Sequence, residues 1–211
     1  SYQLAARMQT AAKEAMDIRS ESEATRRLYG IDQERTRDYG TRCLIARRLV
    51  ERGVRFVQVV NNGQSWDQHS NLYTALPDLC AKTDQPVAAL IQDLKALGLL
   101  DSTLVHWGGE MGRLPVIQND GPKEKVGRDH NTYGFTHWLA GGGVRGGMTY
   151  GETDEWGHHA VKDIVTHHDL HATLLHLFGL DHTRLIYRRA GRELSLTDSK
   201  PARVVRDILR S

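Results

Sequence analysis

Val54-Arg55-Phe56-Val57-Gln58-Val59-Val60 is the stretch that decides the expected fold, because it reads as a buried strand. A second apolar run, Thr103-Leu104-Val105-His106-Trp107, reads as another strand. A helical pattern from Leu79 to Leu97 lies between them, and a second helical pattern, from Thr36 to Gly53, precedes the first strand. The order helix, strand, helix, strand implies right-handed crossovers between parallel strands. We therefore expect an α/β fold with a mostly parallel sheet flanked by helices.

The rest of the chain continues this pattern without an internal repeat. We expect an amphipathic helix over Leu4–Met16, a surface loop over Leu114–Arg128, a third strand over Phe135–Ala140, a helix from Asp169 to Gly179, a hairpin over Ile186–Leu196 and a terminal helix over Ala202–Leu209. The chain starts inside a helical pattern without an initiator Met, so we expect it to be the C-terminal part of a longer protein.

Composition narrows the class of protein. With 211 residues, 39% of them hydrophobic, the chain can bury one sizeable core, and we expect one domain over residues 1–211. The net charge of +2, from 28 basic and 26 acidic residues, does not indicate the excess of basic residues that is typical of nucleic-acid-binding proteins. No apolar run approaches the roughly 20 residues of a membrane span. Cys43 and Cys80 lack the spacing of a metal knuckle or a redox pair, so they read as core residues.

A candidate metal site begins at Trp66-Asp67-Gln68-His69, just after the first expected strand. In open α/β sheets, ligands bind beyond the carboxyl ends of the strands. The side chains of Asp67 and His69, at positions i and i+2, can share one face of an extended segment, and a carboxylate with an imidazole is ordinary ligation for a divalent metal. The alternative is that Asp67 caps the following segment and His69 is an exposed loop residue.

Two further motifs add candidates. Glu110 and Arg113 lie in Gly108-Gly109-Glu110-Met111-Gly112-Arg113, where the glycines indicate close backbone approach to a ligand and Arg113 could hold an anionic oxygen. The alternative there is a glycine-rich turn with a Glu–Arg surface pair. Asp129-His130 offers a second Asp–His pair that completes a cluster if the long loop folds back; the alternative is an Asx-type turn with an exposed His130.

A second concentration of histidines lies farther along the chain. His167 and His171 have the i, i+4 spacing that clamps a metal on a helix, but no Glu lies between them as in a metalloprotease. We interpret these histidines as structural or surface residues, and a metal-storage module would require them to converge. The group comprises His158, His159, His167, His168, His171, His176 and His182.

Several motifs lie between Leu99 and Leu175: Leu99-Leu100-Asp101-Ser102-Thr103-Leu104-Val105, Gly108–Arg113, Gly127–His130, Trp138–Gly143, Gly151–Glu155 and Asp169–Leu175. Together they resemble one bacterial family, catalogued as domain of unknown function fifteen-oh-one and similar to the sulfatase and alkaline phosphatase-like superfamily. The resemblance implies an alkaline phosphatase-like fold, represented here by its C-terminal portion. It also implies export, because such proteins often carry a twin-arginine signal.

The resemblance also assigns roles to the candidate residues. In that superfamily two metals, often zinc, flank a Ser or Thr nucleophile. Asp67 and His69 resemble the first Asp/His ligand pair, and His130 resembles the last histidine ligand. Glu110 stands where an adjacent Asp-His is usual, which removes one imidazole. The nucleophile is expected upstream of this chain.

These observations lead to a functional hypothesis. We expect a metal-dependent hydrolase of phosphate or sulfate esters, acting on a small-molecule or glycan ester. Asp67, His69, Glu110 and His130 would hold a divalent metal, zinc before manganese or calcium, while Arg113 and Arg128 would contact the ester oxyanion. The alternative is an exported, non-catalytic binding or scaffold protein that keeps the fold, which the Glu110 departure motivates.

Overall fold

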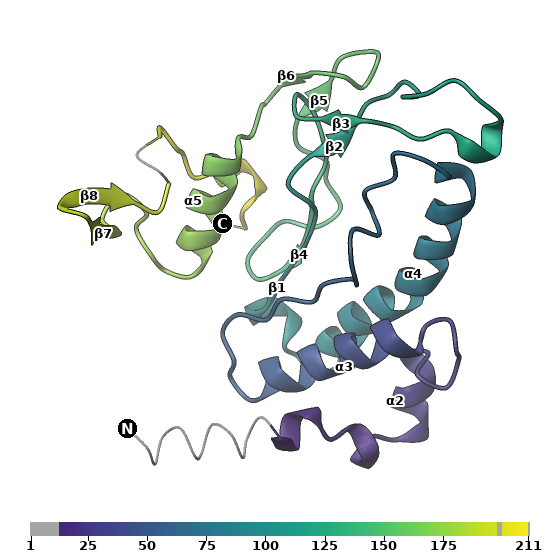
Figure 1. The fold of residues 1–211 in the computed structure, drawn as a ribbon. Helices are drawn as coiled ribbons and strands as arrows, with labels where there is room; N and C mark the ends of the chain where they lie inside the picture. Colours follow the sequence, from purple (N-terminus) through teal and green to yellow (C-terminus); the bar gives the residue numbers. More distant parts are fainter. Residues whose placement is uncertain (1–12, 198–199, 211) are drawn as a thin grey trace. The chain divides into compact units, whose positions relative to one another are not determined.

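The computed structural model describes residues 13–197 and 200–210, and within them the chain divides into two compact units. Unit 1 comprises the chain up to Thr103 together with Val116–Asp129. Unit 2 comprises Leu104–Pro115 together with the chain from His130 onward. Figure 1 colours the elements along the sequence, and each unit is described by itself below.

Unit 1 is helical. Its helices are α2 (Glu23–Leu28), α3 (Arg37–Glu51) and α4 (Leu72–Ala96), with 3₁₀ turns at Ile18–Ser20, Leu100–Ser102 and Lys123–Lys125. Helices α3 and α4 pack against each other (Figure 1). Their contact buries the core of the unit, formed by Tyr29, Ile31, Cys43, Leu44 and Ala89. Burial raises the pKa of the Cys43 thiol to about 12, in keeping with the core role expected for it.

Helix α3 confirms the helix expected before Gly53, whereas α4 begins at Leu72 and not at Leu79. The sequence pattern missed its first turns because Pro77 lies inside the helix. The chain enters α4 through Asn71, whose φ of 54° is left-handed and therefore turns the backbone sharply just after His69. This turn is what directs the segment before α4 away from the helix axis.

A buried ion-pair network ties the start of unit 1 to its two long helices. Arg47 of α3 lies 2.9 Å from a Glu21 oxygen and 3.0 Å from an Asp93 oxygen, and Arg48 also pairs with Glu21. The Tyr29 hydroxyl donates to the same Asp93 carboxylate at 3.0 Å. All the charges of this network are therefore paired, which is the condition under which buried charges are tolerated.

The stretch Val54–Val60, expected as the first strand, is not a strand: it has a bend at Arg55 and forms no ladder with any other described segment. Val59 packs on the helical core, while Phe56 on the opposite face is 74% exposed. Arg42 of α3 donates to the Val60 carbonyl at 2.7 Å and so holds the end of the segment. The alternation of side chains serves packing on helices here, not pairing within a sheet.

Unit 2 contains short strands in antiparallel pairs. Strand β1 (Leu104–Trp107) pairs with β4 (Trp138–Gly141) in a register that sets Trp107 opposite Trp138, and the two rings stack with centroids 6.3 Å apart. The other pairs are β2 (Gly112–Arg113) with β3 (His130–Asn131), β5 (Glu152–Thr153) with β6 (Ala160–Lys162), and β7 (Ile186–Arg189) with β8 (Arg192–Ser195).

The expected fold class is therefore wrong. Within the part of the chain that the structure describes, each sheet is two-stranded and antiparallel, and none is a mostly parallel sheet flanked by helices. The prediction assumed that Val54–Val60 and Thr103–Trp107 pair with each other through the helix between them. The first stays unpaired, and the second pairs instead with β4, which follows it in the chain.

Helix α5 (His167–Leu177) fixes the C-terminal segment of unit 2. Thr166 and Asp169 form a capping box at its start, and Asp169 also accepts the backbone N–H of Arg203 at 2.8 Å. Burial alone would raise the pKa of Asp169, but the backbone N–H groups of Thr166 and Arg203 hold it below its usual range. The Val205 N–H donates to Thr173 at 3.0 Å and extends this attachment.

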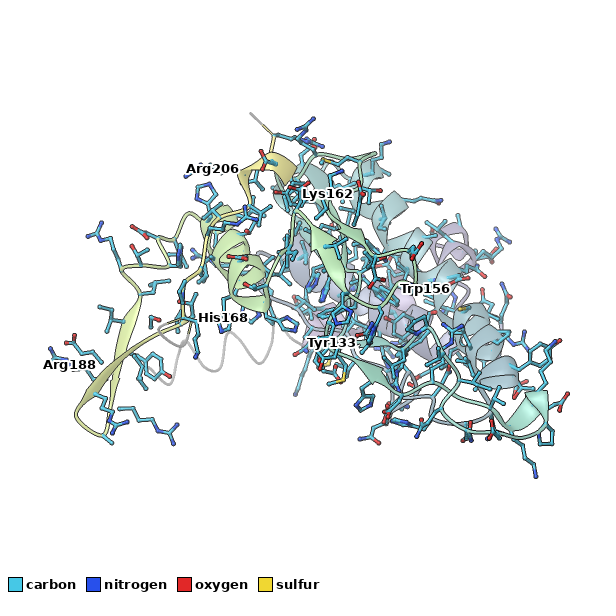
Figure 2. All side chains as sticks on the ribbon, turned by 90° about the horizontal axis from the view of Figure 1, so that it is seen from above. Tyr133, Trp156, Lys162, His168, Arg188 and Arg206 are labelled. Atoms are coloured by element: carbon cyan, nitrogen blue, oxygen red, sulfur yellow. The ribbon has the colours of Figure 1, made fainter. Side chains whose placement is uncertain are left out.

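The remaining predictions had mixed outcomes. The hairpin expected over Ile186–Leu196 is confirmed as β7–β8, which carries the exposed Arg188 labelled in Figure 2. The terminal helix expected over Ala202–Leu209 is wrong, because only Arg206–Ile208 forms a 3₁₀ turn. Most of the helix expected over Leu4–Met16 lies outside the described residues. None of the helices described is long and apolar enough to cross a membrane.

The buried network in unit 1 gives a test of stability. The Glu21 side chain is 11% exposed and forms ion pairs with both Arg47 and Arg48. Glu21→Gln removes the carboxylate charge that these two buried guanidinium groups share. We expect the free energy of unfolding to fall by about 3 kcal/mol, measured by urea unfolding followed by circular dichroism. Glu23→Gln is the control, because Glu23 is 86% exposed and its variant should unfold like the parent. Equal losses in the two variants would contradict this assignment.

Candidate metal site

Asp67 and His69 lie in a tight turn between the stretch Val54–Val60 and helix α4. The Asp67 N–H donates to the Gln64 carbonyl at 3.0 Å, and the His69 N–H donates to the Asp67 carbonyl at 3.2 Å. Gln68 between them is 7% exposed and donates from its side chain to the Ser65 carbonyl. The turn therefore buries Gln68 and leaves the side chains of Asp67 and His69 half-buried.

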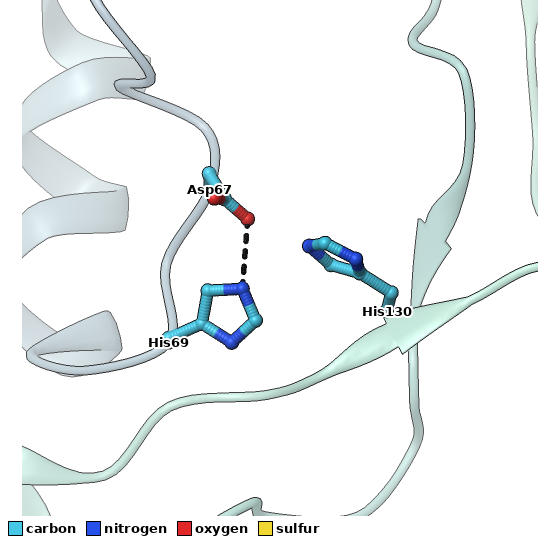
Figure 3. Close-up of side chains that lie close together, drawn as sticks. All are labelled: Asp67, His69 and His130. Carbon is cyan, nitrogen blue, oxygen red and sulfur yellow. Dashed lines mark ion pairs between the residues drawn. The ribbon is translucent and has the colours of Figure 1, made fainter.

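The two side chains face each other as the spacing predicted. His69 Nε2 lies 3.0 Å from Asp67 Oδ1, and Figure 3 draws this contact as a dashed line. The side chains of Asp67 and His69 are 30% and 36% exposed, so both remain reachable from solvent. A carboxylate oxygen and an imidazole nitrogen thus point at the same small volume.

The second nitrogen of His69 has its own partner. His69 Nδ1 lies 2.6 Å from Gln118 Oε1, and Asp129 Oδ1 is 3.8 Å from the same nitrogen. When Nδ1 carries the proton it donates to Gln118, and Nε2 is left with its lone pair toward Asp67. A ligating histidine typically donates its other N–H to a carbonyl or carboxylate in this way. Gln118 is therefore a positioning residue for His69.

Sequence reasoning missed Gln118, because the region Leu114–Arg128 reads as a polar surface loop without periodicity. The structure shows instead that this loop is bound to the turn. The Arg128 N–H donates to the Gln68 carbonyl at 3.1 Å, and the Gln118 N–H donates to the Gly127 carbonyl at 2.9 Å. No spacing rule connects Gln118 to His69 across that distance in sequence.

Gly127 sets how closely the loop approaches the turn. Its backbone is buried against His69 so tightly that an added Cβ would overlap the carbonyl group of His69 and the nitrogen of Ser70. The Gly127 N–H donates to the Asn119 side chain at 3.1 Å, which holds the two ends of the loop together. Only glycine fits at this position.

His130 is the first residue of unit 2, in β3, where it stands opposite Arg113 of β2. The next residue, Asn131, is fully buried and anchors this strand pair, since its amide donates to the carbonyls of Gly134 and His158 at 3.0 and 2.9 Å. Asp67, His69 and His130 form a group of residues that could hold a metal ion, and Figure 3 draws all three.

The donor set fits a divalent metal. One carboxylate and two imidazoles are the ligand types of a catalytic zinc site, which usually keeps a further position open for water or substrate. Manganese and calcium favour more oxygen ligands, so this set suits zinc better. Of the predicted divalent-metal site, the structure shows one part: Asp67, His69 and His130 form a group that could hold an ion, while the identity of the metal stays a prediction.

Glu110, the fourth ligand predicted, lies in unit 2, where His167 Nε2 donates to its backbone carbonyl at 2.8 Å. Gly108, two residues before Glu110, has no room for a Cβ, because the ring of His137 lies against its backbone. Gly108 therefore serves close packing on a histidine ring, whereas a Cβ at Gly109 would meet only the Met111 carbonyl oxygen at 3.7 Å. The ligand role of Glu110 and the substrate contacts of Arg113 and Arg128 stay predictions.

The histidines of unit 2 include a pair, His106 and His137, that no sequence pattern connects. His106 Nε2 and His137 Nδ1 lie 2.7 Å apart, and burial lowers the pKa of both rings. Among the described residues, the histidines from His158 to His182 form no group that brings three potential metal ligands together. His158 and His159 instead donate backbone N–H groups to Asp154.

Comparison with known proteins adds one finding to this geometry. Residues 1–209 match the family described as Protein of unknown function (DUF1501). The chain belongs to the DUF1501 family. This confirms the family resemblance carried by the motifs, whereas the relation to sulfatases and alkaline phosphatases stays a prediction. No curated protein and no solved structure matches this DUF1501 chain.

The close approach at Gly127 can be tested directly. Gly127→Ala forces the loop away from His69, so we expect a loss of about 1–3 kcal/mol in unfolding free energy, typical of overpacking. Faster hydrogen exchange at the amides of His69 and Arg128 should accompany it. Gly146→Ala is the control, because a Cβ there meets no atom within 4 Å. Unchanged exchange in Gly127→Ala would refute the tight contact.

Proposed function

We propose that this DUF1501 protein binds a divalent metal, zinc first, through Asp67, His69 and His130 and hydrolyses phosphate or sulfate esters with it. The observation that carries the proposal is the environment of His69. Its Nε2 faces the Asp67 carboxylate at 3.0 Å, while its Nδ1 lies 2.6 Å from the Gln118 oxygen. A metal-ligating histidine binds the ion through one ring nitrogen and donates a hydrogen bond from the other, and the contacts of His69 fit this arrangement.

The covalent chain supports including His130. Asp129 Oδ1 lies 3.8 Å from His69 Nδ1 in unit 1, and His130 follows Asp129 directly. Consecutive Cα atoms are about 3.8 Å apart across a trans peptide. His130 is therefore tethered within side-chain reach of the Asp67–His69 pair, and the resemblance to the sulfatase and alkaline phosphatase-like superfamily implies that His130 is the last histidine ligand. We propose Glu110 as a fourth ligand, although it departs from the Asp-His that the superfamily usually has there.

The chemistry divides among the residues as follows. A bound metal would lower the pKa of a nucleophilic hydroxyl or water and offset the charge that develops on the ester oxygens. Asp67 supplies the negative charge of the ligand set, and Gln118 keeps the His69 lone pair on Nε2. Arg113 or Arg128 would bind a non-bridging ester oxygen through paired N–H groups. The nucleophile is expected outside this chain.

Metal content gives the first test. After dialysis against zinc and then against metal-free buffer, the protein should retain zinc in a simple whole-number ratio, measured by plasma mass spectrometry. Asp67→Ala and His69→Ala should lose it, because each removes a ligand. Asp120→Ala, an exposed carboxylate of the neighbouring loop, is the matched control and should keep it. Unchanged zinc binding in Asp67→Ala would refute the site.

The role of Gln118 needs its own variant. Gln118→Ala removes the acceptor for His69 Nδ1–H, and we expect zinc affinity to fall about 10- to 100-fold with the ligands intact. Competition with a fluorescent zinc chelator measures the affinity. Gln64→Ala is the control: it removes a side chain that is not part of the site and keeps the backbone carbonyl that accepts the Asp67 N–H, so this variant should bind zinc like the parent. An equal effect of both variants would show that Gln118 acts only through the fold.

Hydrolysis is the second test and requires the full-length protein. We expect zinc-loaded protein to turn over p-nitrophenyl phosphate or p-nitrophenyl sulfate, and chelation or His130→Ala to abolish the turnover. Release of p-nitrophenol is followed by absorbance. Stoichiometric zinc binding without turnover of either ester would favour the alternative, a non-catalytic binding protein that keeps the metal.

A further inference from the structure

A cavity of about 610 Å³ lies within unit 1, between the first turns of α4 and the loop Val116–Asp129. Apolar side chains form most of its wall: Leu72, Leu76 and Pro77 from α4, and Ile117 and Val126 from the loop. Its volume falls within the range of roughly 300–1,000 Å³ that is usual for small-molecule sites. The cavity thus offers an apolar surface large enough for an organic group.

The walls of this cavity are the same backbone that holds the candidate metal site. Ile117 directly precedes Gln118, the residue that contacts His69. The Leu72 N–H donates to the Val126 carbonyl at 3.0 Å, which closes the loop onto the start of α4. Arg128 lines the cavity and donates its backbone N–H to Gln68, between Asp67 and His69. The cavity is therefore next to the turn that carries Asp67 and His69.

The charged residues of the lining are both cations. Lys123 and Arg128 line the cavity, and none of the described residues that line it is acidic. Lys123 Nζ lies 4.2 Å from the centroid of the Tyr73 ring, so a cation and an aromatic face are presented together. An occupant that complements this lining has an apolar body and a negative charge.

We propose that this cavity binds the apolar aryl or alkyl group of an amphipathic anion, with the negative group toward Lys123 and Arg128. The proposal rests on the hydrolase function for one point, that the anion is the phosphate or sulfate ester hydrolysed at the neighbouring metal site. The lining offers the hydroxyl groups of a sugar few partners, because its polar side chains are those of Tyr73, Lys123 and Arg128. The preferred esters are therefore hydrophobic and not glycans.

The test uses the fluorescent aryl sulfonate 1-anilinonaphthalene-8-sulfonate, which has the required charge and cannot be hydrolysed. We expect saturable binding to one site on the folded protein in the presence of a metal chelator. Ile117→Asp should weaken the affinity at least tenfold, because it places a negative charge in the apolar wall. Val116→Asp is the matched control: Val116 is equally exposed in the same loop but does not line the cavity.

A second pair of variants tests the charge requirement. Lys123→Glu should weaken binding of the aryl sulfonate several-fold and leave binding of the neutral analogue N-phenyl-1-naphthylamine unchanged. Lys125→Glu, two residues along the same 3₁₀ turn and outside the lining, should change neither. Both probes are titrated at the same ionic strength, since surface charge effects depend on salt.

The outcomes separate this proposal from the hydrolase function. Dye binding that survives chelation and Asp67→Ala supports the cavity whatever the protein does with metal. Absence of a saturable site, or equal losses in Ile117→Asp and Val116→Asp, overturns the cavity even if zinc binds and esters are hydrolysed. Equal losses of both probes in Lys123→Glu overturn the preference for anions.

Discussion

The backbone contact between Gly127 and His69 is the constraint on which the candidate site depends. With no Cβ in the way, the loop lies directly on the turn, and the N–H of Arg128 reaches the carbonyl of Gln68. Gln118 is brought to His69 by the same approach, and the same loop forms one wall of the open apolar cavity. A segment that the sequence predicts to be a polar surface loop therefore positions a histidine and lines an apolar cavity.

The parts of the molecule that follow from local patterns could be predicted from the sequence. The helix before Gly53, the hairpin of β7 and β8, and the facing side chains of Asp67 and His69 all depend on residues close together in the chain. The family followed from motifs between Leu99 and Leu175, and the family match extends over residues 1–209. The predicted parallel sheet failed because strand pairing depends on residues far away in the chain. The alternation of side chains in Val54–Val60 distinguishes two faces of the segment but does not say which part of the protein each face contacts.

Two other features could not be predicted from the sequence, because each depends on residues that are far apart in the chain. Gln118 has no periodic or spacing relation to His69, and only the folded loop brings their atoms to 2.6 Å. His106 and His137 are likewise joined across the β1–β4 pair, because the antiparallel register sets β1 beside the segment that leads into β4. The glycines before Glu110 were interpreted as sites of close approach to a ligand, but Gly108 packs against an imidazole ring of the protein itself, and Gly109 has no close neighbour among the described residues.

The position of Asp67 and His69 in one short turn affects how much metal binding at this pair would stabilise the folded state. Residues two apart stay neighbours in an unfolded chain, so the unfolded state keeps part of the metal affinity of this pair. Stabilisation by a ligand equals the difference between its binding to the native and unfolded states. A metal held by this turn therefore raises the melting temperature by less than its native affinity alone implies. The remainder comes from contacts that exist only after folding, above all the hydrogen bond of Gln118 to His69.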